Sequence, residues 1–328
     1  MTAPARAGGV VADMVGDMAG DMARDLARDM AVVDGVPARA TKVGRRHTPG
    51  PFSDGSRTLI MGVVNVTPDS FSDGGQWFEP DAAVTHGLAL LADGADLLDV
   101  GGESTRPGAQ RPTVAEELRR VIPVVSTLAA EGARVSVDTM RAEVAEAALD
   151  AGALLVNDVS GGLADPAMLP LVAAREVPLV LMHWRGHSVD MQDRAAYGDV
   201  VAEVCRELAA RRDAALAAGI RLDRLVLDPG LGFAKLAEHN WTLLARLSAL
   251  ADLGLPLLLG ASRKAFLGKV GRPEGSVPRP PIERDAATAA TSVLAALAGV
   301  WAVRVHDVRS TRDALDVVEA SLAHGGVG

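Results

Sequence analysis

The feature of this sequence that most restricts its fold is an alternation that occurs eight times after residue 57: a short apolar run, then a longer stretch rich in Ala and Leu with helical periodicity. Eight βα units over about 270 residues are typical of a single (β/α)₈ TIM barrel, an α/β fold with one closed parallel sheet. A doubly wound open sheet shows the same alternation and is the main alternative, but the number of strands favours the barrel. The apolar runs begin at Leu59, Leu97, Arg134, Leu154, Pro178, Arg224, Leu255 and Trp301.

Residues 1–57 differ in composition and are predicted to be a low-complexity N-terminal extension of the barrel domain, which spans residues 58–328. Aspartates recur there at every fourth position, each followed by Met or Leu, at Asp13, Asp17, Asp21, Asp25 and Asp29. On a helix, these apolar residues would form a slowly winding stripe that could dock on a partner. The simpler interpretation, which we favour, is a flexible or weakly helical extension.

Composition and charge narrow the class of protein. Apolar residues make up 48% of the chain, enough for a large core, which excludes wholesale disorder. The formal net charge of −9 argues against broad contact with nucleic acid or an anionic membrane, and no apolar run approaches the roughly 20 residues of a membrane-spanning helix. The single cysteine, Cys205, suggests a reducing compartment. Because no secretion signal is recognisable either, we expect a cytoplasmic protein.

Each predicted strand ends in polar residues, and this regularity predicts the location of a site. Closing a barrel brings the C-terminal ends of all its strands to one rim, where barrel active sites lie. We therefore expect these side chains to converge on one pocket that suits a polar heterocycle and an anion. They are Asn65, Asp99, Asp138, Asn157 with Asp158, His183, Asp228, Ser262 to Lys264, and Arg304 to Asp307.

Two loops at this rim have the composition of an anion site. The first strand leads into NVTPDSFSDGG, residues 65–75, whose proline and paired glycines are typical of a mobile lid. The second strand leads into GGESTRPG, residues 101–108, where glycines let backbone amides approach an anion and Arg106 adds a bidentate fork. A plain tight loop with a solvated arginine explains this second motif equally well.

Arg304 and His306 lie two residues apart on the last predicted strand and therefore face the same way. An arginine in the otherwise apolar WAVRVHDV would be costly without a partner, so with Arg106 these side chains are candidates to hold a phosphate or pyrophosphate. Taken alone, His306 is better explained as a structural histidine. Asn65 offers a neutral oxygen that could help seat Mg²⁺ beside such phosphates, because this ion keeps several waters and borrows substrate oxygens.

Asp138 in SVDT and Asp228 in LDPG each close an otherwise apolar strand. A carboxylate so placed can accept two parallel N–H bonds from an amidine-like edge, such as that of guanine or a 2-amino-4-oxopteridine. Asn157 supplies both a donor and an acceptor for the same ring, and Lys264 could contact a ring carbonyl or a second substrate. The simpler alternatives are carboxylates that cap the following turns and a lysine at a helix start.

Together these segments resemble the dihydropteroate synthase family of folate biosynthesis. The similarity runs from about Leu59 to His306 and rests on MGVVNVTPDSFSDGG, DVGGESTRPGA, SVDT, NDVSGG, LMHW, LDPGLGFAK, GASRK and RVHDV, of which the first two are highly specific in combination. The family joins 7,8-dihydropterin-6-ylmethyl diphosphate to p-aminobenzoate with loss of pyrophosphate, and we expect a dissociative substitution at the pterin methylene. Trp184 in LMHW and Ala234 in LGFAK depart from the family pattern.

The resemblance implies a role for each matching residue. The pterin would be bound by Asp138, Asn157, Asp228 and Lys264, with Met182 and Phe233 lining its slot. The diphosphate would be held by Asn65, Thr105, Arg106, Arg304 and His306, with Mg²⁺ at Asn65. The p-aminobenzoate pocket would be formed by Phe71, Ser262 and Lys264 under a loop that includes Asp73. The catalytic candidates among them are Asp73, Arg106, Asp138, Lys264, Arg304 and His306.

The family also implies a homodimer, and the Ala-rich segments from Pro281 and from Thr311 suit close helix packing.

Two other functions remain open. A pterin-dependent methyltransferase barrel would grip the ring in the same way, but it would not need the cluster of Arg106, Arg304 and His306. A non-catalytic pterin-binding paralogue would be expected to lack the first loop or Lys264, and both are present.

Overall fold

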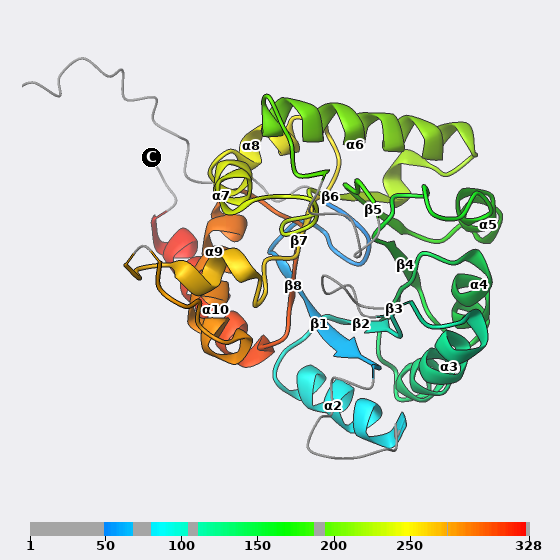
Figure 1. The fold of residues 1–328 in the computed structure, drawn as a ribbon. Coiled ribbons are helices and arrows are strands. Elements are labelled where there is room, and N and C mark those ends of the chain that lie inside the picture. The colour runs from blue at the N-terminus through cyan, green and yellow to red at the C-terminus, as the bar shows by residue number, and fades with distance from the viewer. Residues whose placement is uncertain (1–48, 68–79, 104–110, 187–193, 274, 326–328) are drawn as a thin grey trace, which may run out of the picture. The chain divides into compact units, whose positions relative to one another are not determined.

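In the computed structural model, residues 49–67, 80–103, 111–186, 194–273 and 275–325 are described, all within the unit Gly44–Gly328. Strands occupy the centre of this unit and helices surround them (Figure 1). The strands are β1 (Leu59–Asn65), β2 (Leu97–Gly101), β3 (Val135–Asp138), β4 (Leu155–Asp158), β5 (Leu179–Met182), β6 (Leu225–Asp228), β7 (Leu258–Leu259) and β8 (Ala302–Val305). The helices are α2 (Pro80–Ala92), α3 (Val114–Ala130), α4 (Ala142–Asp150), α5 (Met168–Arg175), α6 (Val200–Ala217), α7 (Ala237–Ala245), α8 (Leu247–Ala251), α9 (Asp285–Leu297) and α10 (Val308–Gly325), with short 3₁₀ helices at Leu222–Arg224, Ala265–Lys269 and Pro281–Arg284.

The sheet is parallel throughout and closes on itself. Its strands follow the order β6-β5-β4-β3-β2-β1-β8-β7. The two end strands are joined by a parallel bridge between Leu227 and Leu257, where the Leu227 N–H donates to the Pro256 carbonyl at 2.9 Å. The predicted (β/α)₈ barrel is therefore confirmed, and the open doubly wound sheet is wrong.

The helix ends follow from residues with clear capping roles. Thr113 caps α3 and Asp199 caps α6, each accepting backbone N–H groups of the first turn. Gly152 and Gly219 follow α4 and α6 with φ values of 109° and 98°, a conformation that glycine adopts without strain. Both helices therefore end at a glycine in the left-handed conformation that commonly ends a helix.

The apolar residues form two main cores on either side of the sheet. The larger lies between the strands and the surrounding helices. Inward-facing side chains fill the N-terminal half of the barrel; they are Leu59, Met61, Leu97, Leu155, Val180, Val226, Leu258, Trp301 and Ala302. Burying one large apolar side chain stabilises the fold by about 1.5–3 kcal/mol. These residues together form a packed core in this half of the interior. The C-terminal half is left for a site.

Residues 49–57 close the N-terminal end of the barrel. Phe52 packs against the inward-facing core, and the Trp301 indole N–H donates to the Pro51 carbonyl at 3.0 Å. A Cβ at Gly50 would lie 2.7 Å from the Trp301 ring, so a side chain there would clash. Residues 1–48 of the predicted extension lie outside the described residues, and the boundary at residue 57 stays a prediction.

Candidate functional site

Polar side chains occupy the inward positions at the C-terminal end of the barrel. Side chains alternate along a strand, so a residue two positions beyond an inward core residue also faces inward. The first such polar residues are Asp99, Ser136, Asn157, Asp228 and Arg304, and those nearer the rim are Asn65, Asp138, Ser262 and His306. The predicted site residues on the strands therefore belong to one alternating series, which explains why they meet.

A cavity of about 980 Å³ lies at this end of the barrel. Its size is at the upper end of the range for small-molecule sites, which is room for two small substrates. Every described residue to which the family resemblance assigns a role lines it, namely Asn65, Asp138, Asn157, Met182, Asp228, Phe233, Ser262, Lys264, Arg304 and His306. Four other polar strand ends that were expected at this pocket do not line it, namely Asp99, Asp158, His183 and Asp307; Asp158, for example, accepts the backbone N–H groups of Ser160 and Gly162 in the turn after β4. The predictions for Phe71, Asp73, Thr105 and Arg106 lie outside the described residues.

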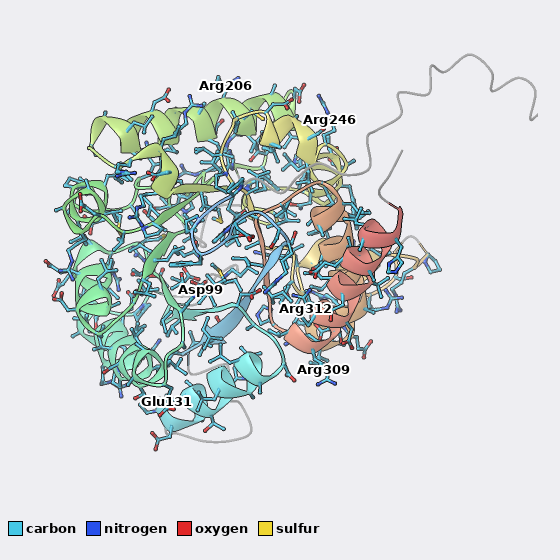
Figure 2. All side chains as sticks on the ribbon, turned by 180° about the vertical axis from the view of Figure 1, so that it is seen from behind. Asp99, Glu131, Arg206, Arg246, Arg309 and Arg312 are labelled. Atoms are coloured by element: carbon cyan, nitrogen blue, oxygen red, sulfur yellow. The ribbon has the colours of Figure 1, made fainter. Side chains whose placement is uncertain are left out.

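Arg304 lies between two carboxylates at the floor of this cavity. Its Nε donates to Asp99 Oδ2 at 2.6 Å and its Nη2 donates to Asp138 Oδ2 at 2.7 Å. Asp99 is fully buried inside the ring of strands (Figure 2) and also accepts from Ser136 Oγ at 2.6 Å and from Asn157 Nδ2 at 3.0 Å. The partner that Arg304 requires inside an apolar strand is thus a pair of carboxylates.

The contacts with Arg304 and Asp99 affect how Asp138 and Asn157 can bind a ligand. Burial raises the pKa of Asp138 to about 7; the Arg304 charge opposes this shift and the nearby Asp99 carboxylate adds to it. Asn157 uses one amide hydrogen on Asp99. Its carbonyl oxygen and its second amide hydrogen are therefore left for a ligand, so Asn157 still offers the predicted acceptor and donor. The hydrogen bond to Asp99 sets the orientation of the amide group.

Asp228, Lys264 and Phe233 form one wall of the cavity. Asp228 Oδ1 accepts the Gly230 N–H at 2.7 Å, and the Lys264 ammonium lies 4.0 Å from the centroid of the Phe233 ring. Burial raises the pKa of Asp228, opposed by the Gly230 N–H and the Lys264 charge. Burial also lowers the pKa of Lys264 to about 8, and the Arg304 charge shifts it in the same direction. The wall therefore combines an acceptor, a cation and an aromatic face.

Further polar groups line the mouth of the cavity. Ser262 Oγ lies 2.9 Å from His306 Nδ1 and accepts the His306 backbone N–H at 3.1 Å, which holds the imidazole in place. Asn65 ends β1 beside Gly101 of β2. Arg263 and Arg284 also line the cavity. This concentration of cations suits anionic substrates.

Several side chains at the site were given no role by the sequence. Asp99 and His183 were expected at the rim as polar strand ends, and Lys235 was recognised only as part of LDPGLGFAK, but none of the three was given a role in binding or catalysis. Lys235 lines the cavity and is only 4% exposed. The signal for Asp99 is its inward position two residues after Leu97. For Lys235 the sequence gives no signal beyond its motif, because nothing in a sequence distinguishes a buried lysine from an exposed one.

The two departures from the family pattern have different surroundings. Trp184 packs beside Met140 and Val159, close to the cavity wall. Ala234 is buried and has a φ of 47°, a left-handed conformation that disfavours every residue with a Cβ. Its carbonyl accepts the Tyr197 hydroxyl at 3.0 Å. The loop after β6 thus contains a strained residue that neighbouring contacts hold in place.

The donor set indicates which kind of metal site this end of the barrel can form. Among the described residues, no group of three His, Cys, Asp or Glu side chains is placed to hold a metal ion. Asn65 offers one neutral oxygen at the cavity. These residues fit a Mg²⁺ ion that takes its other ligands from substrate phosphates and water, and they do not fit a metal held by protein alone.

Comparison with known proteins agrees with this site. The chain matches the family model of pterin binding enzymes over residues 61–306. It is 58% identical over 268 residues to the dihydropteroate synthase of Mycobacterium leprae (strain TN), an alignment that covers 81% of this chain and 94% of that protein.

Solved structures of dihydropteroate synthases are also similar. The Xanthomonas albilineans enzyme with 4-aminobenzoic acid is 49% identical, with a TM-score of 0.75 and coverage of 83% of this chain and 94% of that one. The enzyme from the same species in complex with 7,8-dihydropteroate is 46% identical, with a TM-score of 0.72 and coverage of 83% and 95%. The chain therefore belongs to the dihydropteroate synthase family of pterin binding enzymes.

Proposed function

We propose that this barrel catalyses the reaction of its family: 7,8-dihydropterin-6-ylmethyl diphosphate and p-aminobenzoate condense to 7,8-dihydropteroate, and pyrophosphate is released. The protein is then a folate-pathway transferase of an alkyl group. The observation that carries the proposal is the convergence of Asp138, Asn157, Asp228, Lys264 and Arg304, from five different strands or strand ends, on one cavity. Acids, an amide and cations around one cavity are what a pterin with a diphosphate requires.

In this proposal the pterin ring binds at the floor of the cavity. Asp228 Oδ1 is occupied by the Gly230 N–H, so Oδ2 is the oxygen that accepts from the ring. Asp138 and Asn157 face the same space, and Met182 and Phe233 supply the apolar walls. A hydrogen bond to a charged group contributes about 1.5–3 kcal/mol, so two ionised carboxylates would favour a ring with several N–H donors.

The diphosphate binds toward the mouth. Asn65, Arg304 and His306 all line the cavity, Asn65 and His306 nearer the rim than Arg304, and we assign Thr105 and Arg106, which follow β2 in the sequence, to the same group. A Mg²⁺ ion held at Asn65 would stabilise the negative charge that builds on the leaving diphosphate. The protein's own cations contribute the same kind of stabilisation, which is worth several kcal/mol when the charges are preorganised.

The nucleophile of this reaction needs no strong base to activate it. The carbon–oxygen bonding pair leaves with diphosphate, and the amine of p-aminobenzoate, which is neutral at pH 7, donates its lone pair to the methylene to form the new carbon–nitrogen bond. The amine nitrogen then loses one proton to water. The pocket for this substrate is assigned to Phe71, Ser262 and Lys264. In a dissociative substitution the methylene gains positive charge, which the carboxylates Asp73, Asp138 and Asp228 would favour. A fluorinated pterin substrate that reacts as fast as the natural one would contradict this.

We extend the proposal to a homodimer in the cytoplasm. Helix α9 packs beside α10 and exposes Leu294 and Leu297, at 51% and 44%; exposed apolar groups on an Ala-rich helix support an interface there. Leu294→Asp should shift the mass measured by sedimentation from dimer toward monomer. No helix in the described part of the chain is both long enough and apolar enough to cross a bilayer.

The direct test of the activity is pyrophosphate release. Purified protein is mixed with dihydropterin diphosphate, p-aminobenzoate and Mg²⁺, and each component is omitted in turn. Release that needs all three supports the proposal. Folded protein that binds the pterin but releases no pyrophosphate would favour the non-catalytic paralogue, and methyl transfer from a methylated pterin would favour the methyltransferase barrel.

A further inference from the structure

We propose that Lys235 is a positioning residue for the ring-binding side of the cavity: its ammonium ties the loop after β6 to His183 at the end of β5. This loop runs through Gly230 and Phe233, and Phe233 lines the cavity. The inference rests on the proposed function, because it concerns how the same site is held in shape. Lys235 acts through the loop and through Asp228.

The surroundings of the Lys235 ammonium match its three hydrogens. Nζ lies 2.9 Å from His183 Nδ1, 3.0 Å from the Gly230 carbonyl oxygen and 3.1 Å from the Phe233 carbonyl oxygen. The charged form donates to all three acceptors at once, whereas a neutral amine has two hydrogens and would leave one acceptor facing a lone pair. Burial lowers the pKa of Lys235 to about 7, and the Asp228 charge opposes this shift. The charged form, which the three acceptors favour, links three separate points of the backbone and side chains.

His183 connects this ammonium to the outer helix α6. Nε2 lies 2.9 Å from Glu207 Oε2, and hydrogen bonds from His183 and Arg185 hold the pKa of Glu207 well below its usual range. Because this ionised carboxylate can only accept, the ring carries its proton on Nε2 and Nδ1 accepts from Lys235. Burial and the Lys235 charge lower the pKa of His183 to about 4, so the ring is neutral at pH 7. Glu207 is fixed in turn by Arg185, whose Nε donates to the same oxygen at 3.1 Å. The three groups Glu207, His183 and Lys235 form one directed chain from helix to cavity.

The loop that Lys235 holds has little freedom to pack in another way. Gly230 has a φ of 66°, and a Cβ there would lie 2.4 Å from the His183 carbonyl oxygen, so this glycine is pressed against the end of β5. Its N–H donates to Asp228 Oδ1 while its carbonyl accepts from Lys235. One peptide segment thus joins Lys235 to Asp228, and a second acceptor, the Phe233 carbonyl, sets the aromatic wall.

The charge of Lys235 also acts on Asp228. Burial raises the pKa of Asp228, and the Gly230 N–H and the charges of Lys264 and Lys235 oppose that rise. Without Lys235, Asp228 would be protonated more often and would accept ring N–H groups less well. Geometry and charge therefore predict the same result: weaker binding of the pterin and a smaller effect on p-aminobenzoate, whose assigned pocket meets this loop only where Lys264 contacts Phe233.

The test compares Lys235→Met with wild type by calorimetric titration of dihydropterin diphosphate and by steady-state kinetics. We expect the Kd and KM for the pterin to rise about tenfold or more, while the KM for p-aminobenzoate changes less than about twofold. An unchanged pterin Kd, or an equal rise in both KM values, would overturn the proposal. If Lys235→Met does not fold, Glu207→Gln decides: a rise in pterin Kd of about threefold supports the proposal, and an unchanged Kd overturns it.

The matched control is Arg211→Met. Arg211, on α6, is also a cation that ties a rim loop, because its Nε donates to the Gly161 carbonyl at 2.8 Å, but neither residue lines the cavity. This variant should lower the melting temperature and leave the pterin Kd unchanged; a parallel rise in its Kd would show that loop stability alone explains the effect, against the proposal. Wild type that binds pterin but releases no pyrophosphate overturns the proposed function only, and wild type that binds no pterin overturns both.

Discussion

Replacing Arg304 with alanine tests the ion network at the floor of the cavity. The change removes the guanidinium shared by Asp99 and Asp138, at 2.6 and 2.7 Å. Breaking a buried ion pair by deleting one partner costs about 3–5 kcal/mol. Asp99 keeps its hydrogen bonds from Ser136 and Asn157, so much of the loss falls on Asp138. We expect the free energy of unfolding of Arg304→Ala to fall by about 3 kcal/mol at pH 8.

This loss should depend on pH in a defined direction. In the intact network the Arg304 charge opposes the rise in the pKa of Asp138 to about 7, so its removal raises that pKa further. A protonated Asp138 carries no charge that needs Arg304, so the destabilisation is smaller below this pKa and grows as pH rises through it. The limiting slope for one proton is about 1.4 kcal/mol per pH unit. The difference between wild type and variant should therefore be larger at pH 8 than at pH 6 by about 1–2 kcal/mol.

The assay is equilibrium urea denaturation of both proteins at the two pH values. The control is Arg57→Ala, because Arg57 pairs with Asp96 at a partly exposed position; such a pair is worth about 0–1 kcal/mol, and the effect of its removal should not change between the two pH values. A loss below about 1 kcal/mol for Arg304→Ala, or a larger loss that does not vary with pH, would refute the assignment of Arg304 as the charge that balances Asp138.

Three further changes have outcomes that the structure specifies. Asp228→Asn should raise the Kd for dihydropterin diphosphate about tenfold or more in a calorimetric titration, because an amide mismatches the ring donors; an unchanged Kd would remove Asp228 from the site. The pKa of His183 is lowered from 6.5 to about 4 in the folded state, so it stabilises the fold fully above pH 6.5 and loses that contribution, up to about 3 kcal/mol, as pH falls toward 4; urea denaturation of His183→Gln should lack this acid loss. Ala234→Gly should raise the melting temperature, since it relieves a left-handed φ that costs about 1–2 kcal/mol, and a lower temperature would contradict the inferred strain.

The fold and the location of the site could be predicted because both depend on local patterns. Eight apolar runs with helices between them favour a closed sheet, and polar residues at the end of each run then predict a polar rim. Strand limits were less predictable. The run from Leu255 contains only the two-residue strand β7, because Leu257 pairs with β6 through an isolated bridge and Pro256 accepts the Leu227 N–H.

The pairings inside the site could not be predicted. Arg304 meets Asp99 and Asp138 across 205 and 166 residues of sequence. These contacts depend on how the barrel closes and on the stagger of its strands, and no local sequence pattern determines either. Lys235 was missed for a related reason. Its burial depends on the loop after β6 folding back on His183, and nothing in the sequence around Lys235 marks it as buried.

The contacts at the cavity floor determine which side chains are already ordered before the pterin substrate binds. Asn157 and Arg304 are both oriented by Asp99, so neither has to be ordered when the ligand arrives; ordering one such side chain costs about 0.5–1.5 kcal/mol. Asp138 is different, because its present partner is the Arg304 Nη2. Its Oδ2 accepts from Arg304, so in the proposed reaction its Oδ1 is the oxygen that accepts ring N–H groups, just as Oδ2 is at Asp228, where Oδ1 is occupied by the Gly230 N–H. The ring and Arg304 then bind different oxygens of Asp138, and the ion pair at the floor is kept when the pterin binds.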